Sequence, residues 1–232
     1  MKTLSRLFLL TTLGVSMPLA ATVSVSAQQG FSQTAQAQSR TALPAFTHRQ
    51  TVREDLAIID GGLNATGSFQ GRFTQYGADG SSASGTIYLQ RPGRVRFEYD
   101  APNPLLIVSD GVTLVQQDRA LQTFDRVPLA ATPLNYFLKE NINLANDTEV
   151  VGLQKLPDQW RVTARDGSGQ MAGMITLVFN PNNLALKEWV IVDEFGGTTR
   201  VVLDNLRYNL QLDPRLFILR DEREDRRDRR RR

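Results

Sequence analysis

The stretch GTIYLQRPGRVRFEY, residues 85–99, contains two runs of alternating apolar and polar residues on either side of Pro92-Gly93. A period of two is typical of a strand with one buried face, and Pro-Gly is typical of a tight turn. One face of the second strand carries Val95, Phe97 and Tyr99. By the same count, one face of the first strand carries Ile87, Leu89 and Arg91. The stretch therefore predicts an antiparallel hairpin with an apolar face from which one arginine projects.

Further runs of this kind fill most of the chain after residue 67. We predict eleven strands: Ser68–Tyr76, Ser84–Gln90, Arg94–Asp100, Leu105–Ser109, Thr113–Asp118, Leu121–Val127, Glu149–Lys155, Gln159–Arg165, Met174–Asn180, Leu184–Asp193 and Thr198–Leu206. Turn pairs such as Asp110-Gly111 and Gly196-Gly197 separate them. Strands joined by such short turns run antiparallel, and a sheet of this size curls strongly. The sequence predicts a mainly β fold, an incomplete antiparallel barrel of about eleven strands.

Two helices are predicted beside these strands. Apolar residues at spacings of four and three residues indicate an amphipathic helix from Arg49 onward: Val52, Leu56, Ile59 and Leu63. Gly61-Gly62 is expected to end or fray it. Residues 132–138, TPLNYFL, predict a second apolar-faced helix with Thr132 as N-cap and Pro133 in the first helical position. The two helices either complete an ordinary α+β core or form a lid over a cavity, and the pattern favours neither.

The first 27 residues have the layout of a secretory signal peptide. Lys2 and Arg6 precede a short apolar run, and Val25-Ser26-Ala27 is a small-residue cleavage pattern. The apolar run is too short to span a bilayer, so a membrane anchor is the weaker alternative. Cleavage near Ala21 is a second possibility.

The segments on either side of the predicted domain, residues 48–219, differ from it in composition. Residues 28–47 are rich in Ala, Ser, Thr and Gln and are predicted to form a flexible linker. Residues 220–232 hold eight Arg and five acidic residues and are predicted to be a disordered tail. The formal net charge of the whole chain is +3, of which the tail contributes +3 and the signal peptide +2. The rest of the chain therefore has a net charge of −2. Nucleic acid is therefore not an expected partner, since it requires positive charge on the fold itself.

Few residues of this chain can perform covalent chemistry. It has no Cys and one His, His48, at the junction of linker and helix. A Cys/His dyad, a Ser/His/Asp triad and a His-rich metal site are therefore not expected. Asp193 and Glu194 lie in a turn, and no Gly-rich phosphate loop follows a strand. We expect no enzymatic activity, no cofactor and no metal. Without a cysteine the chain also cannot be acylated as bacterial lipoproteins are.

Two explanations are open for the position of Arg91 on an apolar face. At a strand end, its stem can cover apolar surface while its head reaches solvent. Alternatively, its five N–H donors bind carbonyl groups of a lid, or a polar group of a ligand, at the rim of a cavity. In the second case the bond closes the lid, and cargo that displaces the bond opens it.

Four blocks of the sequence together resemble the outer-membrane lipoprotein carrier protein (LolA) family, over roughly residues 56–217. They are Gly71-Arg72-Phe73-Thr74-Gln75, the stretch 85–99, Pro104-Leu105-Leu106-Ile107-Val108-Ser109-Asp110-Gly111, and Thr132-Pro133-Leu134. The resemblance implies an incomplete barrel with a helical lid and a hydrophobic cavity for the acyl chains of lipoproteins. It also implies a periplasmic, monomeric carrier that takes cargo from an inner-membrane ABC release complex and hands it to an outer-membrane receptor.

The resemblance also assigns residues. The family's functional arginine falls on Arg91, as lid-closing and cargo-release residue. The aromatic residue that the family uses four positions later is replaced by Val95, so we expect Phe97 to take that part. The expected cavity residues are Phe73, Ile87, Leu89, Val95, Phe97 and Tyr99. The expected lid residues are Leu56, Ile59, Leu63, Pro133, Leu134 and Phe137.

Other functions fit the same scaffold. A carrier of another lipid, such as a glycolipid or hopanoid, would need a similar cavity. A sensor of mislocalised lipoproteins in an envelope-stress pathway would need a second domain, for which this chain has little room. The outer-membrane receptor with this fold is itself a lipoprotein, and the missing cysteine argues against it. A hydrolase would depend on His48 or exposed carboxylates.

Overall fold

The computed structural model describes residues 45–167 and 173–219. The predicted signal peptide, the predicted tail and most of the predicted linker lie outside these ranges. Eleven strands form one sheet: β1 (Ser68–Tyr76), β2 (Ser82–Gln90), β3 (Arg94–Tyr99), β4 (Leu105–Asp110), β5 (Thr113–Asp118), β6 (Thr123–Pro128), β7 (Glu149–Lys155), β8 (Trp160–Arg165), β9 (Met174–Phe179), β10 (Leu186–Val192) and β11 (Thr198–Tyr208). The predicted fold class is confirmed.

The sheet is antiparallel throughout and is not closed into a barrel. Its strand order is β6-β5-β4-β3-β2-β1-β11-β10-β9-β8-β7. Nearly every strand therefore pairs with its neighbours in the chain, while the pairing of β1 with β11 joins the two halves. The two edge strands, β6 and β7, are consecutive in the sequence, so the chain crosses the opening of the sheet between them.

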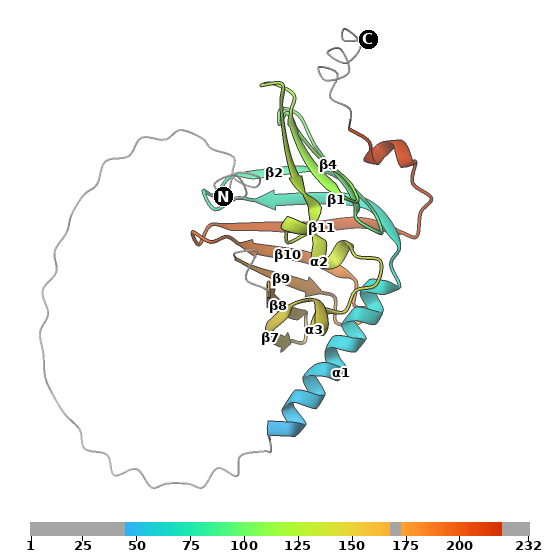
Figure 1. The fold of residues 1–232 in the computed structure, drawn as a ribbon, viewed down its shortest axis with the longest axis vertical. Helices are drawn as coiled ribbons and strands as arrows, with labels where there is room; N and C mark the ends of the chain where they lie inside the picture. Colours follow the sequence, from blue (N-terminus) through green and yellow to red (C-terminus); the bar gives the residue numbers. More distant parts are fainter. Residues whose placement is uncertain (1–44, 168–172, 220–232) are drawn as a thin grey trace, which may run out of the picture.

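Short helices occupy this crossing. The 3-10 helix η2 (Leu129–Ala131), α2 (Asn135–Leu138) and α3 (Leu144–Asp147) follow β6, and α1 (Ala45–Asn64) precedes β1. Figure 1 shows α2 in front of the middle of the sheet, α3 beside the edge strand β7, and α1 along one side of the sheet. We call α1, α2 and α3 the lid. No helix among the described residues is long and apolar enough to cross a membrane.

Alternation along the strands sends apolar side chains to one side of the sheet, which we call the inner face. In β3 the residues are alternately half-buried and buried, and the buried ones are Val95, Phe97 and Tyr99. These side chains and the buried side chains of the lid belong to one hydrophobic cluster. The inner face and the lid therefore share a single core.

The lid helices differ in length from the predicted ones. α1 begins at Ala45, inside the predicted linker, and continues through Gly61-Gly62 to Asn64. It is held beyond the glycines because Leu63 is buried and the Leu63 carbonyl is bound by Arg91.

The second helix is a single turn, and the prediction of Thr132 as its N-cap is wrong. The Thr132 hydroxyl donates to the Leu129 carbonyl, and the residue before α2 is Leu134. Pro133 lies in the preceding turn. The helix ends early because the carbonyls of Phe137 and Leu138, which would continue it, bind the β2–β3 turn instead.

A 3-10 helix after β11, η3 (Pro214–Phe217), packs against the other side of the sheet, over β3 and β4. Phe217 is buried there.

Candidate functional site

The six expected cavity residues lie together on the inner face, on β1, β2 and β3. Each is at most 6% exposed: Phe73, Ile87, Leu89, Val95, Phe97 and Tyr99. The Phe73 ring makes edge-to-face contacts with Phe97, at 5.3 Å between centroids, and with Tyr99, at 5.0 Å. The Tyr99 hydroxyl donates to Gln75 Oε1 at 2.7 Å, and burial raises the pKa of this tyrosine. This part of the sheet is a continuous, mostly aromatic and aliphatic surface.

The expected lid residues face this surface, with one exception. Leu56, Ile59 and Leu63 are buried along one side of α1. Leu134 and Phe137 are buried before and within α2. Pro133 is only half-buried, because the chain turns there before the helix begins.

Sequence reasoning missed Trp189 on β10, which is fully buried between the two halves of the site. Its ring lies 5.2 Å from that of Phe137 on the lid and 6.1 Å from that of Phe97 on the sheet. Among the described residues, no acceptor binds its Nε1. Trp189 and Ile191 are buried at alternate positions of β10, which indicates an inner position, while a register shift separates them from the buried Leu186. Its contact with Phe97 joins β10 to β3, which are far apart in the sequence, so no local pattern predicts it.

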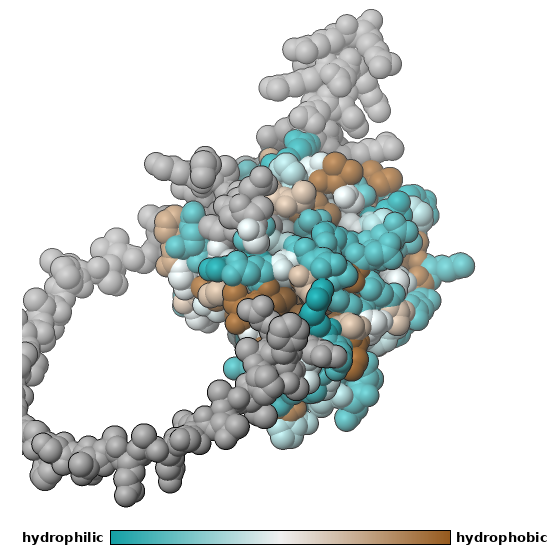
Figure 2. Space-filling model, turned by 60° about the horizontal axis from the view of Figure 1, so that its bottom comes forward, coloured by the Kyte–Doolittle hydropathy of each residue, from teal (hydrophilic) through white to brown (hydrophobic). Residues whose placement is uncertain are grey.

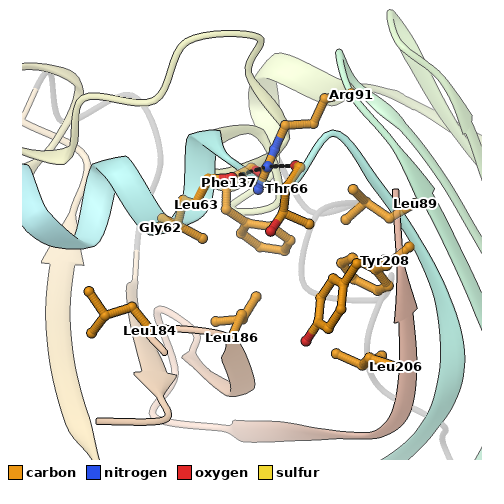
Figure 3. Close-up of a pocket in the computed structure, with 11 residues that line it drawn as sticks. Gly62, Leu63, Thr66, Leu89, Arg91, Phe137, Leu184, Leu186, Leu206 and Tyr208 are labelled. Atoms are coloured by element: carbon orange, nitrogen blue, oxygen red, sulfur yellow. Dashed lines mark hydrogen bonds between the residues drawn. The ribbon is translucent and has the colours of Figure 1, made fainter. Parts of the chain in front are cut away.

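Arg91, at the end of β2, links the sheet to both main parts of the lid. Its Nε donates to the Phe137 carbonyl at 2.9 Å, and its Nη1 donates to the carbonyls of Leu63 and Thr66 (Figure 3). The last carbonyls of a helix carry partial negative charge, which favours a cation. The head group therefore lies against lid carbonyls rather than in solvent. Burial lowers the pKa of this guanidinium to about 10, so it stays charged at neutral pH.

The turn that follows Arg91 makes a further bond to the lid. The Gly93 amide donates to the Leu138 carbonyl at 2.7 Å. Gly93 has a positive φ of 71°, and a Cβ there would lie 2.5 Å from the Gly111 Cα. Only glycine fits this turn without a shift of the backbone.

The parts of the lid are also bonded to one another. Asn64 donates from Nδ2 to the Ile142 carbonyl at 2.9 Å and accepts from the Ile142 amide at 2.8 Å. Asp60 accepts from the Leu144 amide at 3.1 Å, at the start of α3. Burial raises the pKa of the Asp60 carboxyl. These bonds join α1 to the segment that carries α2 and α3.

Little free space remains between the lid and the inner face. A void of about 10 Å³, room for about one water molecule, lies below Arg91. Gly62, Leu63, Thr66 and Phe137 line it on the lid side. The remaining lining comes from Phe69, Leu89, Arg91, Leu184, Leu186, Leu206 and Tyr208 (Figure 3). Lid side chains therefore fill the space over the inner face.

The outer surface is largely hydrophilic on the side seen in Figure 2, with separate apolar patches. No group of three or more His, Cys, Asp or Glu side chains that could hold a metal occurs in the part of the chain that the structure describes. The side chain of His48 is not described.

Comparison with known proteins places the chain in a family. The family model "Outer membrane lipoprotein carrier protein LolA" matches residues 64–220. The outer-membrane lipoprotein carrier protein of Chromobacterium violaceum is 28% identical over 186 residues, which cover 75% of this chain and 85% of that protein. That of Bordetella pertussis is 32% identical over 177 residues, 71% of this chain and 80% of that protein. A solved LolA superfamily structure from Nitrosomonas europaea covers 71% of this chain and 97% of its own, with 10% identity and a TM-score of 0.42. This chain belongs to the outer membrane lipoprotein carrier protein LolA family.

Proposed function

We propose that this protein is a periplasmic chaperone that binds the acyl chains of lipoproteins between the inner face and the lid and carries them from the inner to the outer membrane. One observation carries the proposal. Two apolar surfaces, on the lid and on the sheet, are in contact, and Arg91 at the end of β2 is bonded to carbonyls near the ends of α1 and α2. Apolar contacts of this kind can be exchanged for contacts with acyl chains. The bonds of Arg91 and Gly93 meanwhile attach the lid to the sheet.

The energetics suit a carrier that both binds and releases. A buried acyl chain gains about 0.8 kcal/mol per methylene. Cargo must first displace the lid side chains, which lose their own burial, so the two terms largely offset each other. Small differences in affinity for the lipoprotein between donor, carrier and acceptor then determine the direction of transfer, and the carrier itself needs no ATP. Arg91 closes the lid in the empty protein and is freed when cargo enters.

The rest of the proposal follows from the family and the sequence. The mature chain is exported by its signal peptide and acts as a monomer. It accepts lipoproteins from an inner-membrane ABC release complex and passes them to an outer-membrane receptor, without a cofactor and without catalysis. A carrier of another lipid is the second candidate, because an apolar inner face does not by itself select lipoproteins.

Native mass spectrometry of the mature protein mixed with a triacylated lipoprotein tests the proposal. We expect a one-to-one soluble complex, and no complex with the same lipoprotein lacking its acyl chains. Phe97→Glu places a charge on the inner face and should reduce complex formation at least tenfold. Tyr88→Glu, on the outward side of β2, should leave it unchanged. Circular dichroism checks that both variants fold.

A co-purified free lipid, with no lipoprotein complex, would instead identify the protein as a carrier of that lipid. Equal binding by the Phe97→Glu variant and the unaltered protein would contradict an inner-face site.

A further inference from the structure

The contact between α1 and the turn that joins β9 to β10 differs from every other attachment of the lid. Gly62 of α1 lies directly against Leu184 of this turn, and a Cβ added at Gly62 would be 2.9 Å from the Leu184 Cβ. The two segments touch because one of them lacks a side chain. No described hydrogen bond joins residues 61–64 to residues 180–185. Elsewhere α1 is held by the polar bonds of Asp60, Asn64 and Arg91, and by an ion pair of Asp55 with Lys155 of β7, at 2.8 Å.

Leu184 has an unusual backbone for its residue type. Its φ is 54°, in the left-handed region that an L side chain with a Cβ adopts at a cost. Asn205 and Asn209 share this region, but asparagine tolerates it, and Gln122 lies at an exposed turn. A leucine held in a disfavoured conformation marks a place where surrounding contacts compensate strain, as occurs at ligand clamps. Here the turn's own backbone hydrogen bonds hold Leu184, whose amide donates to the Asn180 carbonyl at 2.9 Å, and its side chain packs against Gly62.

The void below Arg91 lies directly inside this contact. Its lining runs from Tyr208, which is 40% exposed, to Leu89 and Phe137, which are fully buried. Figure 3 shows Leu184 and Leu186 on one side of it, Leu206 and Tyr208 on another, and Arg91 above. The lining is apolar except for the guanidinium and a few neighbouring polar groups. This suits an acyl chain, which is an apolar tail with a carbonyl group at its head that a guanidinium can bind.

We propose that the Gly62–Leu184 contact is the portal through which an acyl chain reaches the inner face. The proposal rests on the carrier function above and specifies its route. Separation of Gly62 from Leu184 breaks only apolar contacts at that point, because the ion pair of α1 with β7 is formed by Asp55, seven residues earlier in the helix. The incoming chain replaces these contacts with contacts of the same kind. The polar attachments of α1 to the rest of the lid remain intact until the chain reaches Arg91.

A reversible cross-link tests the route, because the chain has no cysteine of its own. Gly62→Cys with Leu184→Cys would place the two Cβ atoms 2.9 Å apart. The two segments must separate slightly to reach the Cβ distance of a disulfide, about 3.5–4.5 Å. Uptake of a fluorescent synthetic triacylated lipopeptide is followed by stopped flow. We expect the oxidised variant to take up the probe at least tenfold more slowly than the reduced one, with full recovery after reduction.

Thr74→Cys with Ser84→Cys is the matched control. The two hydroxyl oxygens lie 3.1 Å apart between β1 and β2, on the outward side of the sheet. Its oxidation should not change the uptake rate. Fast uptake by the oxidised portal variant would overturn the portal while leaving the carrier function standing. Absence of binding by the unaltered protein would overturn both.

A second pair of variants keeps the test valid if the cysteine pair does not fold. Leu184→Gly relieves the backbone strain and removes the side chain that closes the portal, so uptake should be several-fold faster. Gln122→Gly relieves the same strain at the β5–β6 turn, at the other end of the strands, and should have no effect. Equal rates for the two glycine variants would contradict the portal.

Discussion

At the scale of single residues, Arg91 contributes more to the site than any side chain near it. It is surrounded by carbonyl oxygens from three lid residues, and none of these bonds is to a carboxylate. A buried cation without a counter-ion is costly unless its donors are satisfied, and here backbone dipoles satisfy them. Because the Leu63 oxygen belongs to α1, the Thr66 oxygen to the segment just after it and the Phe137 oxygen to α2, one side chain is bonded to both helices.

Arg91→Leu should loosen the lid without unfolding the sheet. Three carbonyls lose a charged donor, and such bonds contribute about 1.5–3 kcal/mol each. We expect amide hydrogen exchange in the last turn of α1 and in α2 to increase at least tenfold, while exchange in β1 and β2 stays slow. Delivery of bound lipoprotein to an outer-membrane receptor should also fall.

Arg94→Leu is the matched control, since Arg94 lies three residues further on, past the same turn. It should leave exchange in the lid unchanged. Unaltered exchange in the Arg91→Leu variant would show that the lid is held by apolar packing alone.

At the scale of elements, the lid is a set of helices bonded to one another as well as to the sheet. Asn64 and Asp60 attach α1 to residues 142–144, so the end of α1 and the start of α3 move together. Asp60 is the strained member of this link. Its carboxylate is buried, it has one backbone donor, and Asp147 lies close enough to add repulsion.

Asp60→Asn should stabilise the protein at neutral pH. The raised pKa of Asp60 means that the folded protein binds this proton more tightly than the unfolded chain does. The contribution of Asp60 to the free energy of unfolding is therefore fully present below its pKa in the unfolded chain, near 3.8. It is lost as the pH rises through the higher pKa of Asp60 in the folded protein. Asparagine keeps the acceptor for the Leu144 amide and removes the buried charge.

Thermal melts measure this effect. The Asp60→Asn variant should melt a few degrees above the unaltered protein at pH 7, and the difference should shrink towards pH 3. Asp158→Asn, at an exposed position, should show no such pattern. A lower melting temperature for Asp60→Asn at pH 7 would mean that the carboxylate stabilises the lid.

Strands could be predicted from the sequence far better than helix ends. All eleven strands lie within two residues of their predicted bounds, because alternation and turn residues are local signals. The end of α2 depends instead on the distant donors Arg91 and Gly93, which no pattern within residues 132–138 reveals. The place of Trp189 beneath the lid likewise depends on its contact with Phe137, which is distant from it in the sequence.

At the scale of the whole molecule, the two sides of the sheet are covered differently. The lid covers the inner face, while the segment after β11 crosses the outward side of β3 and β4. There Leu106 and Val108 are buried, and Arg96 Nη1 donates to the Leu216 carbonyl at 3.3 Å. Phe217, 2% exposed, anchors this segment. The end of the described chain is therefore part of the fold.

Phe217→Ala should destabilise the protein by about 3–5 kcal/mol, the usual cost of removing a buried phenylalanine. Urea denaturation followed by circular dichroism measures it. Ile218→Ala, at a neighbouring position that is 53% exposed, should cost less than about 1 kcal/mol. Deletion of Arg220–Arg232 should leave the transition where it is. A large loss on that deletion would show that the predicted tail belongs to the fold.

The all-carbonyl environment of Arg91 has a consequence for control. A peptide oxygen does not titrate, and the guanidinium loses its proton only near pH 10. The bond that holds the lid is therefore the same in mild acid as at neutrality. Because its acceptors carry no net charge, it also depends less on ionic strength than an exposed ion pair. This attachment of the lid therefore does not respond to moderate changes in pH or salt, and in the proposed function it is released by a molecule that competes for the donors of Arg91.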